Sequence, residues 1–133
     1  MLYNKDWEQK SNPLRKRSAA SPVSDLLYKA AALLEKHGHA KYVRKSVNGS
    51  MCLLGAIEVA EHGEVIAFRR DSGLTIQAAE AIIQALGIKP HKREDARFPA
   101  VNWNNADERT AQEVIDTMRL AAHLHSHKEK QNA

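Results

Sequence analysis

The single cysteine of the chain, Cys52, stands where a helix is expected to begin. The dipole and the free amides at a helix N-terminus lower the pKa of a thiol placed there and favour the reactive thiolate. With His39 or His62 as a base and Asn104 as an orienting amide, Cys52 would form a Cys-His-Asn hydrolase or transferase site. The alternative is a small buried hydrophobic residue. We favour burial, because no recognisable nucleophile signature accompanies the cysteine.

A second group of candidate residues is the run Trp103-Asn104-Asn105. Its indole would be a stacking wall and its carboxamides would be hydrogen-bond donors and acceptors, which together would make a ligand-binding turn. Equally, Trp103 would anchor the preceding loop to the core while the asparagine side chains close the turn. We favour the anchoring role for Trp103 and keep all three residues as binding candidates.

Three histidines alternate near the C-terminus, at His123, His125 and His127. On a strand the three would converge on a metal ion, whereas on a helix only His123 and His127 share a face. Metal binding needs further ligands that this segment does not offer. We therefore predict a solvated helix end, with neither a metal site nor a cofactor.

The first twenty residues combine aromatic and basic side chains, in the pattern that stacks on bases and neutralises phosphates. The candidate binding residues here are Tyr3, Trp7, Arg15, Lys16 and Arg17. The alternative to nucleic-acid binding is an arm that docks on a partner protein, or a solubilising tail.

The distribution of charge bears on that choice. Residues 1–20 carry a net charge of +3 and residues 124–133 a net charge of +1, so the whole excess of +4 lies at the two ends. Residues 21–123 hold 13 basic and 13 acidic side chains. A charge-balanced body argues against the basic groove that nucleic-acid recognition normally requires.

Apolar residues at three- and four-residue spacing predict four helices. The first starts at Ser21-Pro22 and stops at Gly38, because Ser21 supplies a capping hydroxyl and Pro22 suits the first helical position. The others are expected from a Ser50 cap to His62, from Leu74 to Leu86, and from a capping box of Thr110 and Glu113 to Ala122. Gly55 lies inside the second helix, where close backbone packing against a neighbour would explain it.

Two segments between these helices have no clear period. Residues 42–48 alternate weakly and end at Asn48-Gly49, which suggests a short strand or an extended link, and a strand here would allow one small β-hairpin. Residues 88–105 contain Pro99 and are expected to be irregular. The predicted fold is therefore a mostly α, compact single domain of about four helices.

Length and composition set the domain organisation. The 133 residues suit one domain, and a low aromatic fraction of 5% within 43% hydrophobic residues favours closely packed helices. We divide the chain into a basic N-terminal arm (1–20), a helical domain (21–123) and a polar C-terminal tail (124–133). No apolar run is long enough to span a membrane and the N-terminus lacks a signal-peptide pattern, so a cytoplasmic location is expected.

Two motifs carry a resemblance to a known family. The run Cys52-Leu53-Leu54-Gly55-Ala56, and later Trp103-Asn104-Asn105 ahead of a helix that starts at Thr110, resemble a small domain of unknown function found in bacteria and their phages. The resemblance covers roughly residues 24–122 and implies a fold but no activity. Members are similar in having a Cys-Leu-x-Gly-Ala helix start and a Trp-Asn-Asp turn. This chain has Asn105 in place of the aspartate, which argues against a carboxylate-dependent role there.

The function expected from these observations is non-catalytic. We predict an accessory binding or regulatory module, encoded by a phage or mobile element and active in the host cytoplasm. It would act through a protein partner or self-association, with the arm as a second contact and without a membrane. The first alternative is a nucleic-acid-associated protein that uses its basic termini. The second alternative is an enzyme that depends on Cys52.

Overall fold

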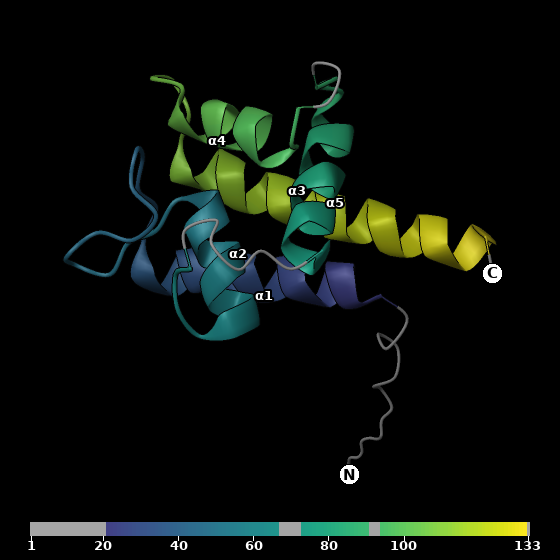
Figure 1. Cartoon of the computed structure of the whole chain (residues 1–133), viewed down its shortest axis with the longest axis horizontal. Helices are drawn as coiled ribbons and strands as arrows, with labels where there is room; N and C mark the ends of the chain where they lie inside the picture. Colours follow the sequence, from purple (N-terminus) through teal and green to yellow (C-terminus); the bar gives the residue numbers. More distant parts are fainter. Residues whose placement is uncertain (1–20, 67–72, 91–93, 133) are drawn as a thin grey trace, which may run out of the picture.

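A computed structural model of the chain describes residues 21–66, 73–90 and 94–132. This part of the chain is helical, as expected, and contains five α-helices and no sheet. The helices are α1 (Pro22–His37), α2 (Leu53–His62), α3 (Gly73–Leu86), α4 (Arg97–Asn105) and α5 (Ala111–Asn132). Figure 1 shows α1 and α5 side by side, with α4 above α5 and the long connection from α1 to α2 at one end of the pair.

The pair of α1 and α5 forms the base of the fold. The two helices run in opposite directions (Figure 1), and the Ser24 hydroxyl near the start of α1 donates a hydrogen bond of 2.6 Å to the Ala122 carbonyl oxygen. Small residues let the helix backbones approach closely, and Ala30, Ala31 and Ala121 are buried. The predicted alanine-rich helix packing is therefore present.

The ends of α1 follow the predicted signals. Ser21 accepts a hydrogen bond of 3.1 Å from the Ser24 N–H, and Pro22 occupies the first helical position. At the other end, Gly38 adopts a positive φ of 98° and its N–H donates to the Leu34 carbonyl oxygen. A glycine is suited to this backbone conformation because it lacks a Cβ.

Helix α2 begins two residues later than a Ser50 cap would require. Cys52 is the N-cap, and its Sγ accepts a hydrogen bond of 3.3 Å from the Gly55 N–H. The Ser50 hydroxyl instead lies 2.7 Å from the Ser46 hydroxyl, within a tight turn that also involves Asn48. The Ser50 prediction was wrong, because local hydrogen bonds within this turn occupy the hydroxyl.

Residues 88–105 are not irregular throughout, because they contain α4. The Asp95 carboxylate accepts a hydrogen bond of 2.9 Å from the Arg97 N–H and so caps a helix that has no capping side chain at its N-cap residue, Ala96. Pro99 lies in the first turn of α4, where a missing N–H leaves no helical bond unmade. The structure therefore has one helix more than the predicted four, because Pro99 in the first turn does not interrupt α4.

The connection from α1 to α2, which we call the strap (residues 38–52), is not a β-hairpin. It contains two isolated bridges, between His39 and Met51 and between Lys45 and Met51. The strap crosses the N-terminus of α2, where the Cys52 N–H donates to the Arg44 carbonyl oxygen over 3.3 Å.

Helix α5 starts at the predicted capping box. The Glu113 N–H donates to the Thr110 hydroxyl over 3.1 Å, and the Thr110 N–H donates to the Glu113 carboxylate over 2.9 Å. The helix continues to Asn132, and the rings of His123 and His127 stack on one face with centroids 6.4 Å apart. None of the helices in the described ranges is both long enough and apolar enough to cross a bilayer.

Candidate functional site

Asn104, in the last turn of α4, connects three parts of the fold. Its side chain is fully buried, and its carboxamide oxygen accepts a hydrogen bond of 3.1 Å from the Leu53 N–H at the start of α2. Its amide nitrogen donates to the Ala40 carbonyl oxygen over 3.2 Å. Asn104 therefore fastens α4 both to the strap and to one of the otherwise unpaired amides of α2.

These contacts also fix the tautomer of His39. Because Leu53 N–H is a donor and Ala40 C=O an acceptor, the orientation of the Asn104 carboxamide is determined. The carboxamide oxygen lies 2.7 Å from Nε2 of His39, so Nε2 must carry a hydrogen and donate it. In the neutral ring, Nδ1 is then the basic nitrogen.

Part of the predicted Cys-His-Asn arrangement is therefore assembled. Asn104 orients His39, but among the described residues no hydrogen bond joins this ring to the Cys52 thiol. The thiol is buried, and burial raises its pKa above the usual value, with hydrogen bonding from the Gly55 N–H opposing that shift to a smaller extent. A protonated, buried thiol that caps α2 is a poor nucleophile.

His62 lies away from this group. It is the last residue of α2, about 15 Å along the helix from Cys52. Its ring is 3.4 Å from the Glu61 carboxylate, so the structure does not bring His62 to the thiol.

Gly55 shows how closely the strap passes over α2. A Cβ built on Gly55 would lie 2.0 Å from the Arg44 carbonyl oxygen, which is far inside the van der Waals limit. The predicted close approach of a neighbouring backbone is therefore present, and the neighbour is the strap.

Asn105 holds the strap from the other side. Its carboxamide oxygen accepts hydrogen bonds from the Tyr42 N–H at 2.9 Å and from the Asn104 amide at 3.0 Å. Its backbone carbonyl oxygen accepts a third bond, of 3.1 Å, from the Tyr42 hydroxyl. Tyr42 has a φ of 69°, in the left-handed region that non-glycine residues rarely adopt, and its side chain is 72% exposed.

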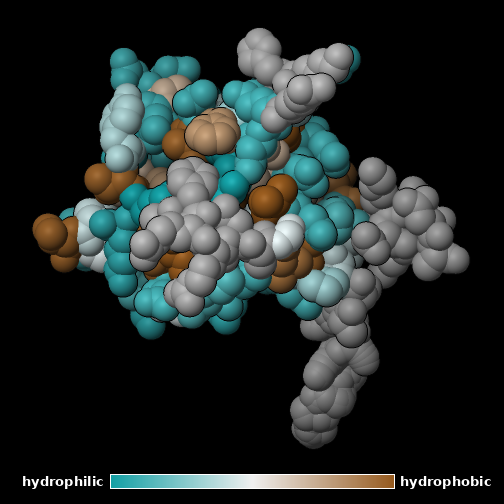
Figure 2. Space-filling view, viewed as in Figure 1, coloured by the Kyte–Doolittle hydropathy of each residue, from teal (hydrophilic) through white to brown (hydrophobic). Residues whose placement is uncertain are grey.

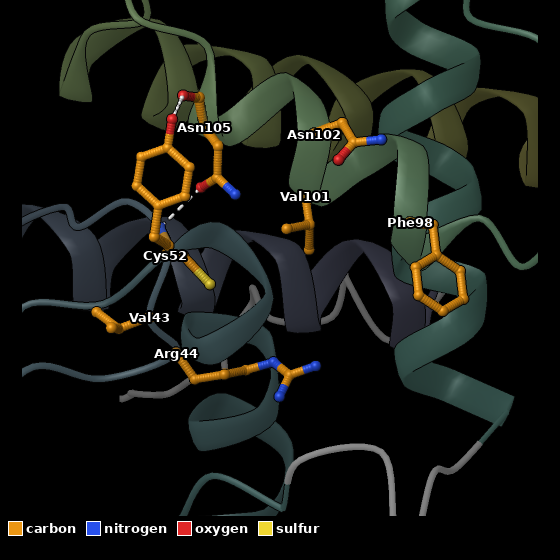
Figure 3. Close-up of a pocket in the computed structure, with 8 residues that line it drawn as sticks. Val43, Arg44, Cys52, Phe98, Val101, Asn102 and Asn105 are labelled. Carbon is orange, nitrogen blue, oxygen red and sulfur yellow. Dashed lines mark hydrogen bonds between the residues drawn. The ribbon is translucent and has the colours of Figure 1, made fainter.

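A hollow of about 250 Å³ lies between α4 and the strap (Figure 3). Its lining residues are Tyr42, Val43 and Arg44 of the strap, Cys52, and Phe98, Val101, Asn102 and Asn105 of α4. Tyr42, Val43 and Phe98 are three of the seven large hydrophobic residues that are exposed in the described part of the chain. Three exposed apolar side chains therefore lie around one concave site.

The α4 wall of the hollow is one face of the helix. Its four lining residues, Phe98, Val101, Asn102 and Asn105, recur at the spacing of a helical stripe. The opposite face packs inward, where Ala100 and Asn104 are buried. Sequence reasoning missed Phe98, Val101 and Asn102, because their common spacing has meaning only once residues 97–105 are known to be helical.

Arg44 is the charged side chain within the hollow. Its Nε lies 3.8 Å from a carboxylate oxygen of Glu58, which is fully buried in α2. The same Glu58 oxygen accepts a hydrogen bond of 3.3 Å from the Ile66 N–H. The charge of Arg44 is therefore matched by a buried carboxylate, and this part of the hollow is not a cationic site.

Trp103 lies on α4 beside the hollow but does not line it. Its ring is partly buried against the core, and the Arg109 guanidinium lies 4.2 Å from the ring centroid. The same guanidinium donates a hydrogen bond of 3.0 Å to the Trp103 carbonyl oxygen. These contacts place Trp103 at the junction of α4 and α5, as an anchor would be placed.

The remaining predicted site residues belong to the N-terminal arm. Tyr3, Trp7, Arg15, Lys16 and Arg17 lie outside the described residues. Within the described ranges, no group of three histidine, cysteine, aspartate or glutamate residues is arranged to hold a metal ion.

The fold and the site together define a small helical protein with an apolar hollow between a helix and a hydrogen-bonded strap. A family model matches residues 18–124, and the chain belongs to this family, which is described as a family of unknown function, DUF6197. No curated protein and no solved structure matches the chain.

Proposed function

We propose that the protein is a non-catalytic binding module that captures an apolar side chain of a protein partner in the hollow between α4 and the strap. The main support is the cluster of exposed Tyr42, Val43 and Phe98 around one concave site. Large apolar side chains that enter such sites dominate the energy of many protein interfaces. On the face seen in Figure 2, hydrophobic residues form separate spots among mostly hydrophilic ones.

The backbone of Tyr42 gives a second line of support. A left-handed conformation costs a non-glycine residue about 1 kcal/mol, and here three hydrogen bonds between Tyr42, Asn105 and Asn104 maintain it. The outcome is an aromatic ring presented to solvent at the edge of the hollow. Backbone strain is typical of functional sites, so we expect the ring of Tyr42, which the strained backbone keeps exposed, to contact a partner.

The two alternative functions have less support. Thiol chemistry would need an accessible thiolate, whereas Cys52 is 3% exposed and its pKa is raised by burial. Nucleic-acid binding would depend on the arm, because the charges of residues 21–123 balance. We propose the arm (residues 1–20) as a second contact with a protein partner.

The experiment is a titration of the full-length protein with N-acetyl-tryptophanamide and N-acetyl-leucinamide, followed by amide chemical shifts. We expect saturable shifts at Tyr42, Val43 and Val101 with millimolar affinity, as for small apolar fragments. Phe98→Asp should abolish them, since it places a charge in the hollow. Tyr28→Ala removes an exposed aromatic residue elsewhere, on α1, and should leave them unchanged.

Phe98 is 51% exposed, so its replacement should leave the fold intact, and an unchanged pattern of distant amide shifts checks this point. Shifts scattered over the surface, or shifts that persist in Phe98→Asp, would show that the hollow is not the binding site.

A further inference from the structure

This inference rests on the proposed function and concerns the chemistry of the partner. We infer that the hollow receives a segment of polypeptide in which a bulky apolar side chain is followed closely by lysine or arginine. Three observations support it: a carboxamide donor in the hollow, a second carboxamide beside it, and two carboxylates at its edge, the last three groups having no partner among the described residues.

The first observation is the orientation of Asn105. Both hydrogen bonds of its carboxamide, with Tyr42 and with Asn104, use the oxygen, and both partners are N–H donors. The nitrogen is therefore identified without ambiguity, and no described residue accepts from it. Figure 3 shows this nitrogen on the side of Val101, toward the interior of the hollow. It can donate to the carbonyl oxygen of a bound chain.

The second observation is Asn102, one turn earlier on α4. Its side chain is exposed, lines the same hollow, and takes part in no hydrogen bond among the described residues. A carboxamide matches both the N–H and the C=O of a peptide group. Two available carboxamides along one wall suit the alternating donors and acceptors of an extended backbone.

The third observation is the charge of the recess that continues from the hollow. This recess shares Tyr42, Asn102 and Asn105 with the hollow and is also lined by Ala106, Asp107 and Glu108. Neither carboxylate forms an ion pair within the described part of the chain. Lys41 lies next to them, but its ammonium donates to the carbonyl oxygens of Ala106 at 2.6 Å and Asp107 at 3.0 Å.

The balance of charge around the recess is therefore negative. Asp107 and Glu108 contribute two negative charges, Lys41 contributes one positive charge, and Arg44 is offset by Glu58. A partner that places an apolar side chain in the hollow would bring its neighbouring residues to these carboxylates. A cationic neighbour is favoured there, and an anionic neighbour is repelled.

The experiment is a selection of random twelve-residue peptides on the immobilised full-length protein, with prior depletion on Phe98→Asp. Enriched peptides should share a bulky apolar residue with lysine or arginine within about three positions. Their affinity should fall about tenfold on the Asp107→Asn, Glu108→Gln double variant, which keeps size and removes charge. Tyr28→Ala is the control and should bind as the parent does.

Each other outcome has a defined meaning. The selection could enrich apolar peptides that lack basic residues, or apolar peptides with acidic residues whose preference disappears in Lys41→Met. Either result would overturn this inference and leave the proposed function standing. If no peptides are enriched in a way that depends on Phe98, this inference and the proposed function are both overturned. If replacing Trp7 by alanine tightens the binding of the selected peptides, the arm of this chain competes for the hollow, and the inference of a separate partner is wrong.

Discussion

The carboxamide oxygen of Asn104 accepts a hydrogen bond of 3.1 Å from the Leu53 N–H, across 51 positions of the sequence. This bond joins the two motifs that carry the family resemblance, because Leu53 belongs to the Cys52–Ala56 run and Asn104 to the Trp103–Asn105 run. The motifs therefore form one structural joint, in which α4, the strap and the start of α2 are held together. The hollow lies next to this joint and depends on it for its shape.

Replacing Asn104 by alanine should test the joint directly. The change leaves the buried Leu53 N–H and the partly buried Ala40 C=O without partners, and an unsatisfied buried group costs about 1 to 3 kcal/mol. We expect the free energy of unfolding to fall by about 3 kcal/mol in urea titrations. Asn102→Ala is the control on the exposed face of α4 and should change stability by less than about 0.5 kcal/mol. Equal stability of the two variants would show that Asn104 is not the link between the helices.

Asn105→Asp should be tolerated. The bonds of the Asn105 side chain use its oxygen as an acceptor, and an aspartate carboxylate accepts the same two bonds from Tyr42 and Asn104. We expect the free energy of unfolding at pH 7 to stay within about 1 kcal/mol of the parent. Asn105→Leu removes both acceptors and should cost about 2 kcal/mol. If aspartate destabilises as much as leucine, the carboxamide nitrogen has an acceptor within the protein.

Gly55→Ala should be severely destabilising. The added Cβ would lie 2.0 Å from a backbone oxygen, which cannot move without displacing the strap from α2. A cost of at least about 3 kcal/mol is expected in thermal or urea unfolding. Gly73→Ala is a matched control at the start of α3, where the nearest atom to a new Cβ is a Gln77 side-chain nitrogen 3.9 Å away. That control should be neutral or slightly stabilising, since alanine favours a helix over glycine.

The Cys52 thiol should not react in the native protein. Burial raises its pKa, and only the thiolate reacts rapidly with Ellman's reagent at neutral pH. We expect full labelling in denaturant and labelling at least about a hundredfold slower in buffer, as global unfolding controls access. Fast native labelling would return Cys52 to the list of candidate nucleophiles.

The ion pair ahead of α4 should make stability depend on pH in the acid range. The pKa of Asp95 is lowered, chiefly because the Arg97 guanidinium donates hydrogen bonds to its carboxylate. A carboxyl group with a lowered pKa in the folded state stabilises above its unfolded pKa of about 3.9, and that stabilisation is lost as the pH falls. Asp95→Asn should therefore cost about 1 kcal/mol at pH 7, and this cost should shrink as the pH falls through the lowered pKa of the folded state, as measured by urea unfolding. A cost that stays constant over the acid range would show that the charge of Asp95 does not cause the effect.

Local chemistry determined much of the fold. The sequence alone predicted the starts and faces of three of the helices, from the caps at Ser21-Pro22 and at Thr110 with Glu113 and from the periodic apolar residues. These signals were readable because a cap or an apolar stripe involves residues within a few positions of one another. Gly55 also predicted a close backbone neighbour, although not which one.

Tertiary structure decided the rest. Helix α4 begins with a carboxylate two residues before it and carries Pro99 in its first turn, so its local signals resemble those of a loop. The hollow could not be predicted, because it forms between Tyr42 and Phe98, which are brought near each other through the Asn104–Leu53 and Asn105–Tyr42 bonds. The sequence thus determined the helices that have local caps, whereas contacts between segments some 50 to 60 positions apart created the site.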